Sequence, residues 1–184
     1  MRASRPVEVV VLILIFALSV PATRSQTSAP AAQPQPCADA KQKQLDFWIG
    51  DWDLTWPGEK QGEIASGRNS IKRIMDGCVV QENFSGGDSM PLRGMSVSLF
   101  DTTIGKWKQT WVDNEGSYLD FVGEFKDGQM ILVREAFRPD GTRFLQRMVF
   151  KNISPNELDW SWEASKDNGK TWTVQWPIHY KRKV

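Results

Sequence analysis

Residues 93–137 decide the fold of this chain, because two β-hairpins can be read from them directly. They run RGMSVSLF, DTTIG, KWKQTWVD, NEGS, YLDFVGEF, KDGQ and MILVREAF. The Asn, Asp and Gly residues of the connecting segments tolerate the positive φ angles that tight hairpin turns need. The longer runs are rich in aromatic and β-branched side chains, which is typical of antiparallel strands.

The same alternation of turn signal and apolar run continues on both sides of this stretch. No helical pattern lies between the runs, so a parallel βαβ sheet is not expected. A meander of this length that closes on itself leaves no exposed sheet edge. The sequence therefore predicts an all-β fold, an antiparallel up-and-down meander closed into a barrel of about ten strands, with a short helix over 38–45 in front of it. The expected strands are 47–56, 64–75, 78–84, 93–100, 106–113, 118–125, 130–137, 142–153, 158–164 and 172–181.

The amino-terminal 25 residues have the layout of a secretory signal peptide. Arg2 and Arg5 precede an apolar run from Val9 to Val20, and small residues follow that run. The run is short for a membrane span, so cleavage is favoured over an uncleaved anchor, and no stable membrane insertion is expected afterwards. Residues 26–36 lack charge and large apolar groups and are predicted to be a disordered linker. A single domain over 37–184 follows, exported to a bacterial periplasm or the extracellular space.

Charge and cysteine content bear on two further questions, whether the protein binds nucleic acid and whether its cysteines form a disulfide. Without residues 1–25, the 23 basic and 22 acidic residues of the chain fall to 20 and 21, so no basic excess points to nucleic acid. Cys37 and Cys78 are the only cysteines, and an exported location favours a disulfide between them. A redox or nucleophilic thiol is the alternative, but the chain has no CxxC motif.

The segment Gly50-Asp51-Trp52, at the first strand, resembles the Gly-x-Trp signature of lipocalins and related calycin barrels. In that superfamily a basic residue of the last strand packs on the tryptophan, and the resemblance gives this barrel-closing role to Arg182 over Trp52. A wider pattern resembles the exported bacterial domain-of-unknown-function family numbered 1579, which implies a secreted calycin-like barrel and no known reaction. That pattern comprises residues 47–52, 74–78, 100–116, 165–172 and 180–183.

Catalytic chemistry has few candidates in this chain. One histidine, His179, and two cysteines leave no metal-ligand cluster, and no cofactor motif is present, so neither a metal nor a cofactor is expected. Glu82, Asp113 and Glu163 lie on three different expected strands. If they converged inside the barrel, burial would raise a pKa and allow acid–base work. The residues 165–172 also fit an Asp-box pattern, interpreted here as a hairpin turn held by Asp167.

Ligand binding is the preferred functional hypothesis. Trp107, Gln109 and Trp111 share one strand face, and an amide between two rings could orient a small ligand in a cavity. Arg147 is the expected counter-charge for an acidic ligand. The protein is thus predicted to bind a small, partly apolar molecule without catalysis. A hydrolase or isomerase using the inward carboxylates, and an envelope interaction protein with a solid barrel, are the alternatives.

Overall fold

The protein is described by a computed structural model over residues 36–183. The predicted signal peptide, and the predicted linker apart from its last residue, lie outside the described residues. Within 36–183, no helix is long and apolar enough to cross a membrane. The strands are β1 (Gly50–Pro57), β2 (Ile64–Ile74), β3 (Val79–Ser85), β4 (Arg93–Asp101), β5 (Lys106–Asp113), β6 (Tyr118–Lys126), β7 (Gln129–Phe137), β8 (Arg143–Lys151), β9 (Glu157–Ser165) and β10 (Thr173–Arg182). Short 3₁₀ helices are η1 (Ala40–Lys43), η2 (Asp46–Trp48), η3 (Met75–Gly77) and η4 (Gly87–Ser89).

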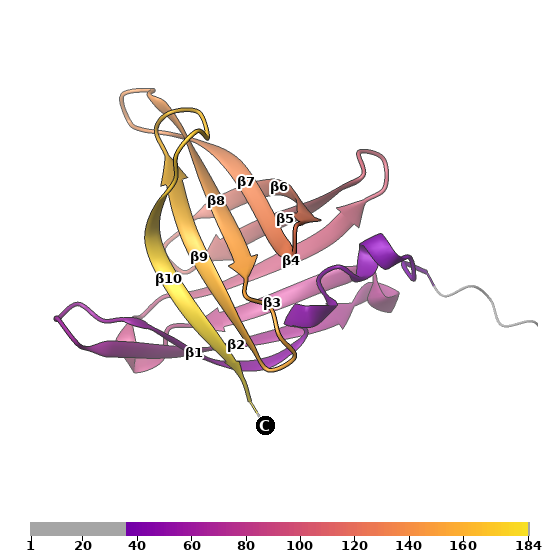
Figure 1. Cartoon of the computed structure of the whole chain (residues 1–184), viewed down its shortest axis with the longest axis horizontal. Coiled ribbons are helices and arrows are strands. Elements are labelled where there is room, and N and C mark those ends of the chain that lie inside the picture. Colours follow the sequence, from indigo (N-terminus) through magenta and orange to yellow (C-terminus); the bar gives the residue numbers. More distant parts are fainter. Residues whose placement is uncertain (1–35, 184) are drawn as a thin grey trace, which may run out of the picture. The chain divides into compact units, whose positions relative to one another are not determined.

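The ten strands form one closed antiparallel barrel, which confirms the predicted fold class (Figure 1). Each strand pairs with its neighbours in sequence, and β1 closes the sheet by pairing with β10, with Leu54 opposite Tyr180. Tight turns join the strands. Asp127 and Gly128, for example, both have positive φ between β6 and β7, as a two-residue hairpin turn requires. Of the predicted helix over 38–45, the structure has the short 3₁₀ helix η1, and η2 follows it where the first strand is predicted to begin.

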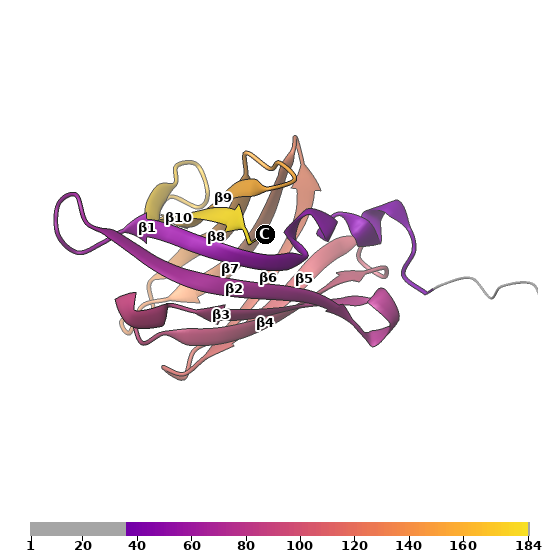
Figure 2. The ribbon, with the colours of Figure 1, turned by 90° about the horizontal axis from the view of Figure 1, so that it is seen from below.

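One end of the barrel is closed by η1 and η2 (Figures 1 and 2). Trp48 of η2 is buried, and its carbonyl oxygen accepts a hydrogen bond of 2.8 Å from Trp52 Nε1. Arg182 lies over the Trp52 ring, with Cζ 4.1 Å from the ring centroid. Its Nη1 donates to the carbonyl of Ile49 and its Nη2 to that of Phe47. This end is therefore filled with aromatic side chains, and the Arg182 guanidinium links β10 to the segment in front of β1.

The glycine of the Gly-x-Trp segment has a steric reason to be glycine. Gly50 has a φ of +134°, which other residues rarely adopt, and a Cβ built on it would lie 2.3 Å from Arg182 Nη1. The missing side chain leaves the space in which the guanidinium crosses to its carbonyl acceptors. The closing role that the calycin resemblance implies for Trp52 and Arg182 thus has a direct geometric counterpart.

The predicted disulfide between Cys37 and Cys78 is confirmed, with the two Cα atoms 5.0 Å apart. It joins the segment in front of η1 to the turn between β2 and β3. Arg73 of β2 reinforces the same corner, since its Nε donates to Asp46 Oδ1 at 2.7 Å and its Nη2 to the Gln42 carbonyl at 2.8 Å. The covalent and the polar links together hold the 3₁₀ segment against this end of the barrel.

Candidate functional site

The interior of the barrel contains a cavity of about 240 Å³. Trp48 and Phe150 line it near the end closed by η2. Leu92, Asp113 and Leu119 line it at the opposite end, where the β3–β4 and β5–β6 loops lie. The cavity therefore extends along the barrel from the closed end toward the loop end. Its remaining lining residues are Glu82, Phe84, Trp111, Phe121, Met148, Trp160, Trp162, Trp176, Ile178 and Tyr180.

The wall of this cavity is mainly aromatic. Neighbouring rings pack edge to face, as in the pair Trp160–Trp176, with centroids 5.8 Å apart, and the pair Phe121–Trp162, also 5.8 Å apart. Such arrangements are the favoured geometry for aromatic pairs, so the rings hold one another in place. The space between them is accordingly a pre-formed apolar pocket, the usual character of a small-molecule site.

Glu82 is the buried acid of the cavity. Its Oε1 accepts a hydrogen bond of 2.6 Å from Asn69 Nδ2, and its Oε2 accepts one of 2.6 Å from Ser96 Oγ. Burial raises the pKa of Glu82 to about 7, and these two hydrogen bonds oppose the rise only in part. No cation pairs with it among the described residues, where the ion pairs all involve other carboxylates. Glu82 thus changes charge near neutral pH.

A belt of polar side chains continues on both sides of Glu82 along the inner wall. Asn69 Nδ2 also lies 3.1 Å from the Tyr180 hydroxyl, its acceptor on β10. On the other side, Gln109 Nε2 donates to Ser96 Oγ at 3.2 Å and to Ser98 Oγ at 2.9 Å. The belt links β10, β2, β3, β4 and β5, and it places a layer of neutral side chains around the Glu82 carboxyl. Within this layer, Asn69 Oδ1 and Gln109 Oε1 are buried without a hydrogen-bond partner among the described residues.

Asp113 lies at the loop end of the cavity and differs from Glu82 in solvation. Its Oδ2 accepts a hydrogen bond from Trp111 Nε1 at 2.9 Å, and its Oδ1 accepts from the backbone N–H groups of Glu115 and Ser117, both at 3.0 Å. Desolvation is the largest influence on the Asp113 pKa and raises it, but the hydrogen bonds together outweigh it and the pKa is lowered. Asp113 is therefore an ionised anchor that orients Trp111 and the β5–β6 turn.

The three β5 residues proposed as ligand contacts all point into the barrel, while Lys108 between them is exposed. Trp111 lines the cavity. Trp107 is buried below it, and its Nε1 donates to Gln44 Oε1 of the closing segment at 3.1 Å. Gln109 is buried within the polar belt. Of the three, only Trp111 is among the residues that line the cavity, because Trp107 and Gln109 lie deeper, where the interior is filled.

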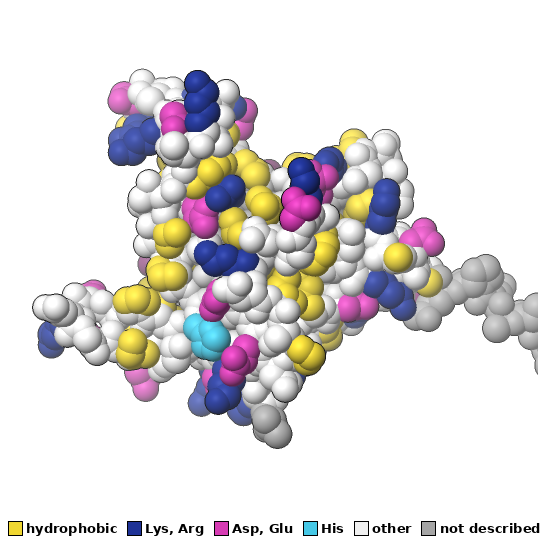
Figure 3. All heavy atoms as spheres, viewed as in Figure 1, with side chains coloured by type: hydrophobic (Ala, Val, Ile, Leu, Met, Phe, Trp, Pro, Cys, Tyr) yellow, Lys and Arg dark blue, Asp and Glu magenta, His cyan; other side chains and the backbone are white. Residues whose placement is uncertain are grey.

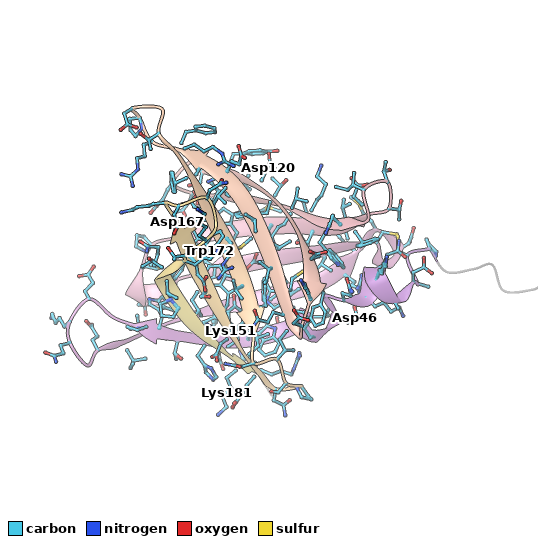
Figure 4. All side chains as sticks on the ribbon, turned by 45° about the horizontal axis from the view of Figure 1, so that its top comes forward. Asp46, Asp120, Lys151, Asp167, Trp172 and Lys181 are labelled. Atoms are coloured by element: carbon cyan, nitrogen blue, oxygen red, sulfur yellow. A yellow bond between two sulfur atoms is a disulfide. The ribbon has the colours of Figure 1, made fainter. Side chains whose placement is uncertain are left out.

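Arg147 and Glu163 require a correction, since neither lines the cavity. They lie opposite each other on β8 and β9, and Arg147 Nε donates to Glu163 Oε2 at 2.7 Å. Arg147 also lies over the Trp172 ring, 4.1 Å from its centroid. Trp172 belongs to the β9–β10 loop with Asp167 (Figure 4). Both residues have the opposite parity to Met148 and Trp162, which do line the cavity, so strand alternation already assigns them to the outer face.

The β9–β10 loop has the turn geometry expected from its Asp-box pattern. Asp167 Oδ1 accepts a hydrogen bond from the Thr171 backbone at 2.9 Å, and Oδ2 accepts one from the Thr171 hydroxyl at 2.6 Å. These bonds, with one from the Ser165 hydroxyl, lower the pKa of Asp167 to about 2. Asp167 therefore stabilises the turn in its ionised form.

Other chemistry-bearing groups lie on the outside. His179 is exposed on the barrel surface (Figure 3). Its Nδ1 lies 2.8 Å from Asp159 Oδ1. Among residues 36–183, no group of three or more His, Cys, Asp or Glu side chains could hold a metal ion.

Sequence reasoning missed several cavity residues. Tyr180, Trp160 and Trp162 line the cavity, as does Trp48, whose indole Nε1 is buried without a hydrogen-bond partner. The parity of β9 and β10 places Trp160, Trp162 and Tyr180 on one face, which is a usable signal. Trp48 lies in η2 rather than in a strand, so no period-two pattern could have assigned it.

Comparisons with known proteins add little to this description. No protein-family model matches the sequence, and no curated protein matches it. Among solved structures, a redesigned β-barrel is similar to this chain with a TM-score of 0.38 and 11% sequence identity, over 79% of this chain and 100% of that one. The barrel described above therefore rests on the strand pairings of this chain.

Proposed function

We propose that this is an exported binding protein that holds one small, partly apolar molecule inside its barrel and does not catalyse a reaction on it. The observation that carries the proposal is the cavity of about 240 Å³ with its aromatic wall. A cavity of roughly 150 Å³ already holds a benzene molecule, so one ring with a short substituent fits here. The open interior favours this function over an envelope protein with a solid barrel.

The polar groups of the cavity support a ligand that is only partly apolar. Trp48 Nε1 is a buried donor that makes no hydrogen bond of normal geometry with the described residues, although it is close enough to the Tyr180 hydroxyl to affect its pKa. Buried polar groups are nearly always paired with protein or water. An acceptor atom of a ligand, or a water molecule held with it, would complete this bond. Glu82 and Tyr180 offer further hydrogen-bonding atoms in the same cavity.

Export and family membership belong to the same proposal. The Cys37–Cys78 disulfide is typical of oxidising compartments, which agrees with the signal-peptide pattern of residues 1–25. The closing pair Trp52 and Arg182 supports the resemblance to calycin barrels and to the family numbered 1579.

The test compares a variant whose cavity is filled by a new tryptophan with a control variant that carries a new tryptophan on the outer face. Native mass spectrometry of the protein isolated from its own host should find a retained small molecule. Leu119→Trp adds a ring at the loop end of the cavity and should abolish this adduct. Val122→Trp, on the same strand but exposed on the outer face, should retain it. Bare protein from the host, with no binding of 2-phenylethanol to the purified wild type, would contradict the proposal.

An acid–base enzyme is the second candidate, because Glu82 and Asp113 line the same cavity while their pKa values are shifted in opposite directions. Two features weigh against it. Asp113 uses both oxygens to hold Trp111 and the turn, and the two residues lie two strands and two positions apart, about 12 Å by strand geometry. A retained molecule whose mass is unchanged after long incubation with the protein would favour binding, and conversion of that molecule would favour the enzyme.

A further inference from the structure

The charged groups that line the cavity are all of one sign. Glu82 and Asp113 are the two ionisable acids of the lining, and no Lys, Arg or His side chain is among the lining residues. Arg134 of β7 faces the barrel interior and is the cation that packs on a lining ring, since its Cζ lies 6.0 Å from the Phe121 ring centroid and its Nη1 donates to Gln146. Arg134 is therefore engaged elsewhere and does not pair with Glu82.

The uncharged part of the wall favours a cation as well. Five tryptophans and three phenylalanines surround the cavity, and the face of an aromatic ring attracts a positive charge, most strongly in tryptophan. Aromatic cages of this kind recognise ammonium groups, especially when a carboxylate is close by. The cavity thus combines an aromatic wall with a carboxyl whose hydrogen-bond partners, Asn69 and Ser96, are both neutral.

We propose that the ligand of this cavity is a small organic cation, with an ammonium group against Glu82 and an apolar body against the tryptophan and phenylalanine rings. The inference rests on the proposed binding function and specifies its ligand class. It replaces the acidic ligand expected from Arg147, because Arg147 lies on the outer face, paired with Glu163. Each Glu82 oxygen accepts one protein hydrogen bond, so each keeps a lone pair for a ligand N–H group.

Binding of a permanent cation should follow the ionisation of Glu82. Asn69 from β2 and Ser96 from β4 face Glu82 and do not titrate. Tyr180 from β10 has its pKa raised by burial and by Glu82, so it stays neutral below pH 9. Asp113 of β5 has a lowered pKa, and burial lowers the pKa of Arg134 of β7, although a guanidinium stays protonated in proteins. Glu82 is thus the group of this set that changes charge between pH 6 and 8.

The experiment uses four probes that share a phenyl ring and a short chain. These are 2-phenylethylamine, (2-phenylethyl)trimethylammonium, neutral 2-phenylethanol and anionic 3-phenylpropanoate, titrated calorimetrically against the full chain at pH 8. Both cations should bind at least tenfold more tightly than the alcohol, and the anion should bind most weakly. The trimethylammonium probe should bind about tenfold more weakly at pH 6 than at pH 8, since only the ionised fraction of Glu82 is competent.

Glu82→Gln keeps a hydrogen-bonding group of similar size and should remove both the cation preference and its pH dependence, while binding of 2-phenylethanol changes less than about threefold. Glu157→Gln, an exposed change of the same type on β9, should leave all four affinities as in wild type. If this variant of Glu82 does not fold, the pH series on the wild type still decides the matter.

The outcomes separate the two proposals. Equal or tighter binding of the alcohol than of the cations, with no pH dependence, would overturn the cationic ligand and leave the binding function standing. Failure of all four probes to bind would overturn the cationic ligand, and together with bare protein from the host it would overturn the binding function too.

Discussion

At the scale of single residues, solvation decides what the two cavity carboxyls do. Glu82 is buried among neutral partners, and loss of hydration raises its pKa to about 7. Asp113 lies at the loop end, where one indole and two backbone N–H groups stabilise its charge and lower its pKa. The same functional group is therefore a titrating site in one position and a fixed structural anion in the other.

The raised pKa of Glu82 predicts a loss of stability with rising pH. Below about pH 4.5 the carboxyl is protonated in both folded and unfolded chains, and above about pH 7 it is ionised in both. Between these values the folded state holds the proton more tightly, so the free energy of unfolding falls as pH rises, by about 3 kcal/mol in total. Urea denaturation at several pH values should show this fall in the wild type.

Glu82→Gln should remove the fall, because the amide does not titrate. Glu157→Gln is the matched control and should retain it. The interpretation would be wrong if the Glu82 variant and the wild type lost the same free energy over this pH range.

At the scale of elements, the barrel depends on how its first and last strands meet. β1 and β10 pair through Trp52 opposite Arg182 and Leu54 opposite Tyr180. Arg182 adds contacts beyond this ladder, to the carbonyls of Phe47 and Ile49 in front of β1 and to that of Pro155 before β9. One side chain therefore joins the η2 segment, β1, β10 and the β8–β9 loop at the closed end.

Arg182→Ala should lower the free energy of unfolding by about 2–4 kcal/mol. It removes the stacking on Trp52 and three charge-assisted hydrogen bonds, and it leaves partly buried carbonyls without donors. Chemical denaturation monitored by tryptophan fluorescence measures the change. Lys181→Ala, an exposed neighbour on the same strand, should cost less than about 0.5 kcal/mol. A similar small cost for both variants would show that Arg182 does not fasten the closed end.

At the scale of the described domain, all strands are paired, so the barrel has no free sheet edge. The closed end of the interior is filled, with Trp52 and Trp107 buried outside the cavity, and the hollow runs from Trp48 and Phe150 toward the loop end. The disulfide lies outside this ring of strands and ties Cys37 to the turn after β2. It therefore constrains the chain without forming part of the cavity.

Removal of the disulfide should destabilise the domain and leave its fold intact. The two cysteines are 41 residues apart, and a cross-link over such a loop contributes about 4 kcal/mol in the chain-entropy model, mainly by restricting the unfolded chain. The double variant Cys37→Ala, Cys78→Ala should keep the far-ultraviolet circular dichroism of the wild type and unfold at a lower urea concentration. An unchanged midpoint would contradict this, as would two free thiols in protein recovered from its host.

Much of the fold was predictable because its causes are local. Turn residues such as Asp127 and Gly128 determine where one strand ends and the next begins, and the period of two determines which residues share a face. The ten strands and their antiparallel order follow from such signals, and the Cys37–Cys78 bridge follows from the presence of two cysteines in an exported chain. Alternation also predicts that Arg147 and Glu163 face outward, because each lies on the other face of its strand from the residues that line the cavity.

The cavity depended on contacts that no local pattern contains. Whether a strand face meets filled core or open space is set by side chains from every strand at the same height, so Trp111 lines the cavity while Trp107 and Gln109 are buried below it. The pKa of Glu82 depends on the water that β2, β4 and β10 exclude from around it. Sequence alone determined strands, faces and the disulfide, because these follow from the local conformational preferences of the chain and from its thiol chemistry. Only the tertiary structure decided the cavity and the raised pKa of Glu82, because cavity volume and desolvation depend on how the side chains of all strands pack together.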